Sequence, residues 1–448
     1  MKFRLTLFHL LVVCSVYSQE IPDIDWTKAG NVLTPDIVID KVDFVEFKSS
    51  FSEALTDDEC VQLIIDKNAE GVTIHFDKGE YFFKEQIRLA SNVSLIGEGE
   101  ETVFNFDLDD EQDCILAQGK KTDISLKLDA SVAKGTNILP VLIDEEFHAG
   151  DYIYLVDQDE ELVESSWAEG KTGQLFQIWV KSDKYIKVNG GHTRRDYILE
   201  WVPSIYKIEP VENVKIEKLK IVNHKATTGQ TSNIHFSYVV NAVIGGVTSE
   251  MGNYSHVLLE YSSNCEIMGC DFWNAHDFGN GGKGYGVTLQ FASCNNIVIG
   301  NHFKRLRHSM LLQAGANGNV LYHNTSTDPY WTDVRLPEDA AGDIVLHGNY
   351  VYANLIENND VQNIVVDNTH GMNGPDNFFY NNRISGYGIY IHRKSPRQVV
   401  IKNEIKKSKW PKGRYRVRGK QFENDNKVGN KRKPRKSEEI YLKESYWL

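Results

Sequence analysis

The feature that most constrains this chain is an Asn-x4-Asn pattern that recurs along its second half. It appears as NCEIMG at 264, NIVIGN at 296, NVLYHN at 319, NLIENN at 354, NFFYNN at 377 and QVVIKN at 398, with starts 32, 23, 35, 23 and 21 residues apart. A period slightly above twenty, made of β-rich segments and Asn/Gly turns, is typical of the stacked coils of a parallel β-helix. The asparagines are predicted to form ladders at the corners, because Asn tolerates left-handed backbone angles and its amide can bond the Asn one coil away.

The N-terminal region supplies the elements that begin such a fold. Residues 56–68 have amphipathic helical spacing, with Cys60, Leu63 and Ile64 on one face, and this helix is predicted to cap the open end of the solenoid. A strand, a Gly-x-Tyr turn and an (S/N)-V-x-L-x-G-x-G segment follow. This opening resembles that of the pectate-lyase-like superfamily, and the matching residues are Gly79, Tyr81, Asn92, Val93, Leu95, Gly97 and Gly99. The resemblance implies an all-β fold, a right-handed parallel β-helix, without pointing to one reaction.

The repeat is interrupted once, which defines the domain organisation. Residues 120–210 alternate apolar and polar side chains, as half-buried antiparallel strands do, and are predicted to form a small inserted β subdomain. It separates an N-terminal cap and first coil (19–119) from the main coils (211–405) and a C-terminal tail (406–448). Residues 393–443 hold nineteen Lys or Arg against five Asp or Glu, although the chain has a net charge of −13. The tail is therefore predicted to be basic and to pack in part on the last coils.

The first eighteen residues predict export. Lys2 and Arg4 precede an apolar run that ends at the small residue Ser18, as in a secretory signal peptide, and the run is too short to span a membrane. We expect a secreted or periplasmic monomer, cleaved near Ser18, with no membrane span and no nucleic acid as partner. The five remaining cysteines are expected to be buried thiols or to include one disulfide.

A column of polar residues is predicted on the outside of one sheet. Strands ending in a polar residue occur as VTLQ at 287, MLLQ at 310, IVLH at 344, IVVD at 364 and IYIH at 389. Strand alternation turns the fourth residue outward, about 4.8 Å from its neighbour one coil away. The column consists of Gln290, Gln313, His347, Asp367 and His392. A carboxylate beside an imidazole suits acid–base chemistry, so His347 and Asp367 are the main candidates; the alternative is a polar sheet face that only satisfies itself.

Two long insertions, residues 274–286 and 328–342, precede strands of this column and are predicted to form the wall of a cleft. Tyr330 and Trp331 in the second insertion are candidates for stacking on sugar rings, or alternatively for packing within the loops. Five further residues beside the column are candidates for binding the substrate: Arg307, His308, Glu357, His370 and Tyr390. For the charged ones the alternative is that they are ordinary surface charges.

Two cleavage mechanisms fit these candidates. A lyase needs a base, a group that neutralises the uronate carboxylate and a proton donor; these roles would fall to His347, to Gln313 or Arg393, and to Tyr390 or His392. A hydrolase needs two carboxyl groups, about 5 Å apart for retention or about 6.5–9.5 Å for inversion, and the candidates are Asp343, Asp367 and Glu357. Lyases of the superfamily commonly use Lys or Arg with Ca²⁺ held by acidic side chains. The column has no Lys and no clustered carboxylates, so no cofactor or metal is assigned and a role for Ca²⁺ stays open.

The expected function is that of a secreted carbohydrate-active enzyme that cleaves an anionic polysaccharide, as a lyase or a glycoside hydrolase. A long β-helix offers a groove for an extended sugar chain, and the resemblance implies many relatives of this kind. The alternative is a non-catalytic glycan-binding or cell-surface protein that uses the β-helix as a platform. Fold alone does not decide between them.

Overall fold

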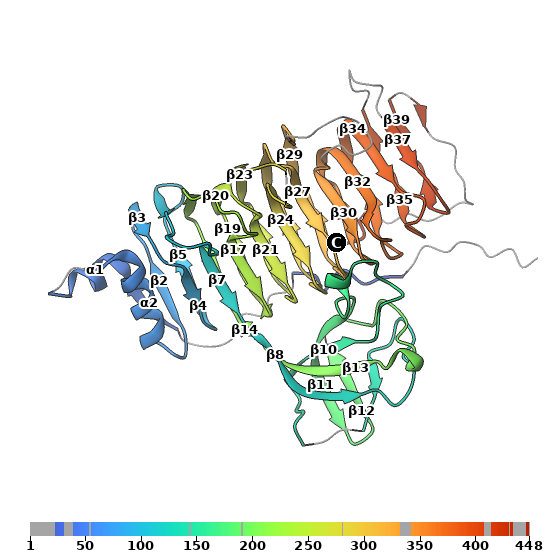
Figure 1. Ribbon diagram of the computed structural model, residues 1–448, viewed down its shortest axis with the longest axis horizontal. Helices are drawn as coiled ribbons and strands as arrows, with labels where there is room; N and C mark the ends of the chain where they lie inside the picture. The colour runs from blue at the N-terminus through green and yellow to red at the C-terminus, as the bar shows by residue number, and fades with distance from the viewer. Residues whose placement is uncertain are drawn as a thin grey trace, which may run out of the picture.

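The parallel β-helix expected from the repeat forms the main body of the protein (Figure 1). The computed structural model describes residues 23–30, 39–52, 55–142, 145–189, 191–279, 281–331, 342–406, 414–429, 431–432 and 445–447. The predicted signal peptide, residues 1–18, lies outside this described part. Among the helices of the described part, none has the length and apolar character needed to cross a membrane.

The coils stack so that their strands form three faces, each paired in parallel from one coil to the next. The first face is a twelve-stranded sheet, which in stacking order consists of β1 (Asp40–Asp43), β2 (Val72–His75), β5 (Val93–Ile96), β15 (Lys215–Glu217), β19 (Val243–Gly245), β22 (Glu266–Met268), β25 (Ile297–Ile299), β28 (Val320–Tyr322), β31 (Leu355–Glu357), β33 (Phe378–Tyr380), β35 (Val399–Ile401) and β38 (Phe422–Asn424).

The second face follows the first in each coil. Its strands are β3 (Gly79–Phe83), β6 (Thr102–Phe106), β16 (Lys220–Asn223), β20 (Thr248–Gly252), β23 (Asp271–Ala275), β26 (His302–Lys304), β29 (Thr325–Thr327), the first parts of β32 (Asp360–His370) and β34 (Arg383–Ile391), β36 (Glu404–Ile405), β39 (Lys427–Val428) and the antiparallel β40 (Lys431–Arg432). Because β32 and β34 continue into the third face, the second and third faces form one continuous sheet.

The third face carries the predicted polar column. Its strands are β4 (Ile87–Leu89), β7 (Ile115–Gln118), β17 (Ser232–Ser237), β21 (Ser255–Glu260), β24 (Tyr285–Gln290), β27 (His308–Leu312), β30 (Ile344–Gly348), the later parts of β32 and β34, and β37 (Arg414–Val417). Ile344 and Leu346 point into the core, as predicted, and are fully buried. Val345, which points outward between them, and Leu311, the equivalent residue of β27, are also buried, because they pack with Tyr254 and Tyr285 on the outer side of the face.

Two asparagine ladders flank the first face. The first joins Asn296, Asn319, Asn354, Asn377 and Gln398, each Nδ2 donating to the next amide oxygen at 2.9–3.0 Å. The second joins Asn301, Asn324, Asn359, Asn382, Asn403 and Asn426 at 2.9–3.0 Å. All of these side chains are buried, so the ladders hold successive coils in register from inside, as the repeat predicted.

The backbone around the ladders differs from the expectation in one respect. The left-handed angle is taken by the residue before the ladder position; Ala353, with φ of 56°, precedes Asn354. In the copy at 264 the ladder positions are occupied by Cys265 and Cys270, whose backbone N–H groups donate to the first asparagine of each ladder. Asn is therefore selected here for its amide rather than for its backbone freedom.

Two helices lie at the N-terminal end of the solenoid (Figure 1): α1 (Phe44–Ser49) and α2 (Asp57–Lys67). Thr56 and Glu59 form a reciprocal capping box that starts α2 at the predicted position. The buried face of α2 consists of Cys60, Val61, Ile64 and Ile65. Leu63, expected on this face, is half-buried.

Both ends of the described chain pack on the outside of the first face. Trp26 is buried against Phe378, with ring centroids 4.8 Å apart, and Tyr446 lies 5.0 Å from Tyr380. The coils continue beyond residue 405, because β37 and β38 extend the third and first faces. Part of the basic tail is therefore an additional coil. The five cysteines of the described part are all buried free thiols: Cys60, Cys114, Cys265, Cys270 and Cys294.

The insertion forms a six-stranded antiparallel sheet below the solenoid in Figure 1. In spatial order its strands are β8 (Lys120–Lys127), β13 (Ser204–Glu209), β10 (Tyr152–Val156), β11 (Gln174–Ser182), β12 (Tyr185–Asn189) and β9 (Ile138–Pro140). It is fastened to later coils by the Lys134–Asp376 ion pair at 2.6 Å and by the Tyr352 hydroxyl, which donates to the Thr172 carbonyl at 3.1 Å. The chain thus leaves the solenoid after its second coil, formed by β5, β6 and β7, and returns to contact coils much further along.

Candidate functional site

His347 and Asp367 form a hydrogen-bonded pair on the third face. Nδ1 of His347, in β30, lies 2.7 Å from Oδ2 of Asp367, in β32. Their side chains are 13% and 20% exposed. A register shift between β30 and β32 follows Leu346, so that Gly348 pairs with His370 and places a third polar side chain beside the pair. The stacking of coils therefore assembles the pair that the sequence predicted.

The carboxylate of Asp367 fixes the orientation of His347. Burial opposes its charge, but His347, through its charge and hydrogen bond, and the backbone N–H of Thr369 hold the pKa of Asp367 below its usual value. An ionised Asp367 accepts a hydrogen bond from the N–H at Nδ1, which keeps the proton on Nδ1 and leaves Nε2 of His347 as the basic atom. Within the described part of the chain Nε2 has no hydrogen-bond partner, so it is available to a substrate.

Two further histidines surround the pair. The ring of His370 meets that of His347 edge to face, with centroids 4.7 Å apart at 83°. His308 lies 6.2 Å from His347, stacks on Tyr285 and donates from Nδ1 to the Gly342 carbonyl at 3.0 Å. Burial, together with the charges of Arg307 and His347, lowers the pKa of His308 to about 3. His308 is therefore a neutral packing residue of the site.

The column on the N-terminal side of the pair is a closed hydrogen-bond network. Gln313 donates to the amide oxygen of Gln290 and, at 3.1 Å, to the Tyr254 hydroxyl. Gln290 donates to Glu260 at 2.6 Å, and Glu260 is 3.3 Å from His235. Gln290 and Gln313 are buried, so the polar groups in this part of the column form their hydrogen bonds with one another. Glu260 was not a candidate, although VLLE at 257–260 has the same pattern as VTLQ at 287.

The other two carboxyl groups proposed for a hydrolase lie elsewhere. Asp343 is fully buried; it accepts from the Ser326 hydroxyl at 2.5 Å and from two backbone N–H groups at 2.7 and 2.8 Å. Burial raises the pKa of Asp343 to about 6. Glu357 is fully buried on the first face and accepts from the backbone N–H of Tyr446 at 3.1 Å. The chain turns between faces just before β30, so Asp343 does not face outward as strand alternation had predicted.

The C-terminal side of the pair is basic. His392 follows β34 in the column, and its ring is 6.4 Å from that of Tyr390. Burial and the charges of Arg393, Lys394 and Arg418 lower the pKa of His392. Arg393 and Lys394 are exposed. Three cations thus gather near the end of the column, where they can attract an anionic ligand.

Tyr330 and Trp331 pack in a cluster formed by the two predicted loops. Tyr330 contacts Phe278 edge to face at 4.9 Å, and the Arg305 guanidinium lies 4.3 Å from the Tyr330 ring. Arg307 lies 4.7 Å from the Trp331 ring and donates to a loop carbonyl at 2.7 Å. The contacts of these rings favour loop packing, which was the alternative to sugar stacking; residues 332–341 lie outside the described part.

Side chains that could jointly hold a metal ion gather, within the described residues, only at the N-terminal end. Ligand atoms of Asp43, His75 and Asp77 lie within 4.8 Å of one another. Asp43 also caps α1 by accepting from Glu46. Asp43 ends β1, His75 ends β2 and Asp77 follows β2, at the opposite end of the solenoid from β30, which carries His347 (Figure 1). A role for Ca²⁺ in the function stays a prediction.

Comparison with known proteins identifies the fold and no family. No family model and no curated protein matches the chain. Among solved structures, it is similar to the tailspike protein gp49 of Pseudomonas phage LKA1, with a TM-score of 0.59 and 15% identity over 83% of this chain and 56% of that one. It is also similar to ORF18 of Geobacillus virus E2, with a TM-score of 0.51 and 13% identity over 86% and 59% of the two chains. The chain spans less than two thirds of either protein, and the likeness is one of parallel β-helix fold.

Proposed function

We propose that this protein is an exported polysaccharide lyase of the pectate-lyase-like type, and that His347 is its general base. The observation that carries the proposal is the 2.7 Å contact between Nδ1 of His347 and Asp367, which leaves Nε2 free to accept a proton. The burial of Asp343 and Glu357 away from this pair favours elimination over a mechanism that needs two carboxyl groups. The signal-peptide pattern of residues 1–18 supports export.

The proposed reaction is a β-elimination in an acidic polysaccharide. Nε2 of His347 takes the proton from the carbon next to the uronate carboxylate. The electron pair of that C–H bond forms a C=C bond as the C–O bond to the next sugar breaks. The departing oxygen takes a proton from a donor, for which Tyr390 and His392 are the nearby candidates. Arg393 or Arg418 neutralises the uronate carboxylate, which makes the adjacent proton easier to remove.

The test is incubation with a panel of uronate-containing and sulfated polysaccharides, read by the ultraviolet absorbance of the unsaturated product. We expect His347→Ala to lower kcat by about 10²–10⁴-fold, the usual contribution of a general base, and Asp367→Asn to lower it because the amide no longer holds the imidazole tautomer. His302→Ala is the matched control, since this exposed histidine also pairs with an aspartate, Asp271, at 3.2 Å on the second face. Full activity of the His347→Ala protein would remove the proposed base.

A second candidate is a non-catalytic glycan-binding protein. It is compatible with the closed network around Gln290 and Gln313, whose hydrogen bonds to each other and to Glu260 give these two side chains no catalytic task. In this case the wild-type protein would be retarded in gels that contain the polysaccharide, while neither the absorbance nor a reducing-end assay would detect product. A reducing end without unsaturation would instead indicate hydrolysis.

A further inference from the structure

The loop between β10 and β11, residues 157–173, brings the inserted subdomain to the His347–Asp367 pair. Asp159 is buried and accepts from the backbone N–H groups of three residues on the returning part of the loop, at 2.6, 3.1 and 3.0 Å. On the solenoid side, Asn349 accepts from the backbone N–H of Glu164 at 3.1 Å and of Ser165 at 3.3 Å. The loop is therefore fixed by its own subdomain and by the coil that carries His347.

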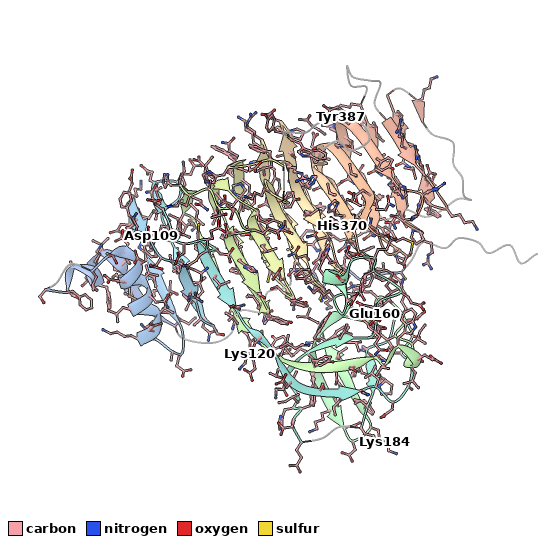
Figure 2. All side chains as sticks on the ribbon, in the orientation of Figure 1. Asp109, Lys120, Glu160, Lys184, His370 and Tyr387 are labelled. Carbon is pink, nitrogen blue, oxygen red and sulfur yellow. The ribbon has the colours of Figure 1, made fainter. Side chains whose placement is uncertain are left out.

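Trp167 lies at the tip of this loop, in a single turn of 3-10 helix (Ser166–Ala168). Its ring is 5.5 Å from that of His370 and 6.1 Å from that of Phe291. His370 in turn contacts His347, so one ring separates Trp167 from the proposed base. Figure 2 shows His370 on the solenoid above the loop that carries Glu160. Trp167 remains 38% exposed despite these contacts, so part of its ring faces solvent.

Lys171, on the same loop as Trp167, also contacts Phe291. Its Nζ is 3.7 Å from the centroid of the Phe291 ring. No carboxylate of the described part lies within ion-pair distance of Nζ, and burial lowers the pKa of Lys171 while the more distant Glu260 opposes this shift. A half-buried ammonium without an ion pair is well suited to bind an anionic ligand, because little solvation remains to be removed.

We propose that the inserted subdomain supplies a saccharide subsite beside the catalytic pair, in which Trp167 stacks on a sugar ring and Lys171 pairs with the carboxylate of a neighbouring acidic sugar. This inference rests on the proposed function and assigns two residues that would bind its substrate. A Trp ring offers a large rigid surface at low entropic cost, and Lys contributes a point charge. Both groups contact Phe291, so they lie within reach of adjacent units of one chain.

The experiment measures binding in the His347→Ala background, where cleavage does not consume the ligand. The probe is the polysaccharide that the wild-type protein cleaves or binds, offered in its acidic and its methyl-esterified forms. We expect Trp167→Ala to weaken binding about threefold to tenfold, as loss of one aromatic contact does, and to abolish the part of the tryptophan fluorescence change that comes from this ring. Lys171→Gln is expected to weaken binding of the acidic form and to leave that of the esterified form unchanged.

The subdomain offers a matched control pair. Trp179, on β11, is also exposed and lies under the Lys187 ammonium at 4.6 Å. Trp179→Ala and Lys187→Gln should leave binding unchanged. In the catalytically active protein, Trp167→Ala should raise KM with little change in kcat, and Trp167→Tyr should keep most of the affinity because a stacking ring is retained.

Three results would overturn the inference, and the first two are distinguishable from the third. If Trp167→Ala binds as tightly as its parent, the ring has no binding role; if Trp167→Tyr loses as much affinity as Trp167→Ala, the ring does not act by stacking on a sugar. In both cases the proposed function stands. If the wild-type protein neither binds nor cleaves any polysaccharide of the panel, the proposed function fails and the subsite fails with it.

Discussion

His235 illustrates how single residues of the third face respond to pH. Its ring lies between two carboxylates, with Nδ1 2.9 Å from Asp113 and Nε2 3.3 Å from Glu260. Burial opposes the positive charge, but the hydrogen bonds and charges of Asp113 and Glu260 prevail and raise the pKa of His235 to about 9. The protonated ring thus bridges two coils, and its charge is a source of stability.

The sign of the pH dependence follows from this shift. The folded-state pKa exceeds the unfolded value of about 6.5, so the stabilisation is fully present below that value and is lost as the pH rises from about 6.5 through about 9. We expect the free energy of unfolding, measured with urea, to fall between pH 6 and pH 9.5 in the wild-type protein and to fall less in His235→Gln. Equal losses in the two proteins would contradict this assignment.

The candidate site could be predicted where it depends on stacking alone. His347 and Asp367 end equivalent strands of neighbouring coils, so periodicity was enough to bring them together. The prediction that Asp343 faces outward was wrong, because the chain turns between two faces at that point and the alternation of inward and outward side chains does not continue through a turn. Trp167 could not be found, since its place beside His370 depends on how a distant insertion docks, and no local pattern encodes that contact.

At the scale of elements, the ladders are the part of the fold that the sequence specifies most directly. The spacing of Asn pairs by five residues places one amide at each end of a three-residue strand of the first face. The inserted sheet was predicted from strand alternation, and β8 to β13 occupy residues 120–209. The predicted coils ended too early, at residue 405, because the short strands β37 (Arg-Tyr-Arg-Val) and β38 (Phe-Glu-Asn) have little apolar character.

Removing one ladder amide should have a measurable cost. Nδ2 of Asn354 donates to Asn377 at 2.9 Å, and its Oδ1 accepts from Nδ2 of Asn319 at 3.0 Å. We expect Asn354→Ala to lower the free energy of unfolding by about 1–3 kcal/mol, because buried partners are left unsatisfied. Gln118→Ala, which removes an exposed amide at the end of β7, should change it by less than about 0.5 kcal/mol. Similar effects of the two substitutions in urea unfolding would argue against the structural role of the ladder.

At the scale of the whole molecule, residues near both ends of the described chain cover an apolar strip on the outside of the first face. The strip includes Leu355 and Phe378, and Trp26 covers it while its Nε1 donates to the Ala353 carbonyl at 2.9 Å. Tyr446 packs on the ring of Trp26 at 6.4 Å. The outward side of this sheet is thus a second, smaller core that depends on both ends of the chain.

Opening this strip should affect both stability and association. We expect Trp26→Ala to lower the free energy of unfolding by about 3–5 kcal/mol, as for other buried aromatic residues, and to promote self-association through the uncovered apolar surface. Met268→Ala, an exposed position on the same face, is the control. Size-exclusion chromatography and urea unfolding would measure the two effects. An unchanged elution volume with unchanged stability would show that Trp26 is not needed to cover the strip.

The docking of the inserted subdomain has a consequence for how the protein comes apart. A solenoid whose coils touch only their neighbours can fray from either end, one turn at a time. Here the subdomain follows β7 in the chain and binds later coils through the Lys134–Asp376 ion pair and the hydrogen bond from Tyr352 to Thr172. The subdomain therefore connects coils that are not neighbours, and the coils between these contacts are expected to unfold together. The coil that holds His347 is thus stabilised by a part of the chain that does not belong to the solenoid.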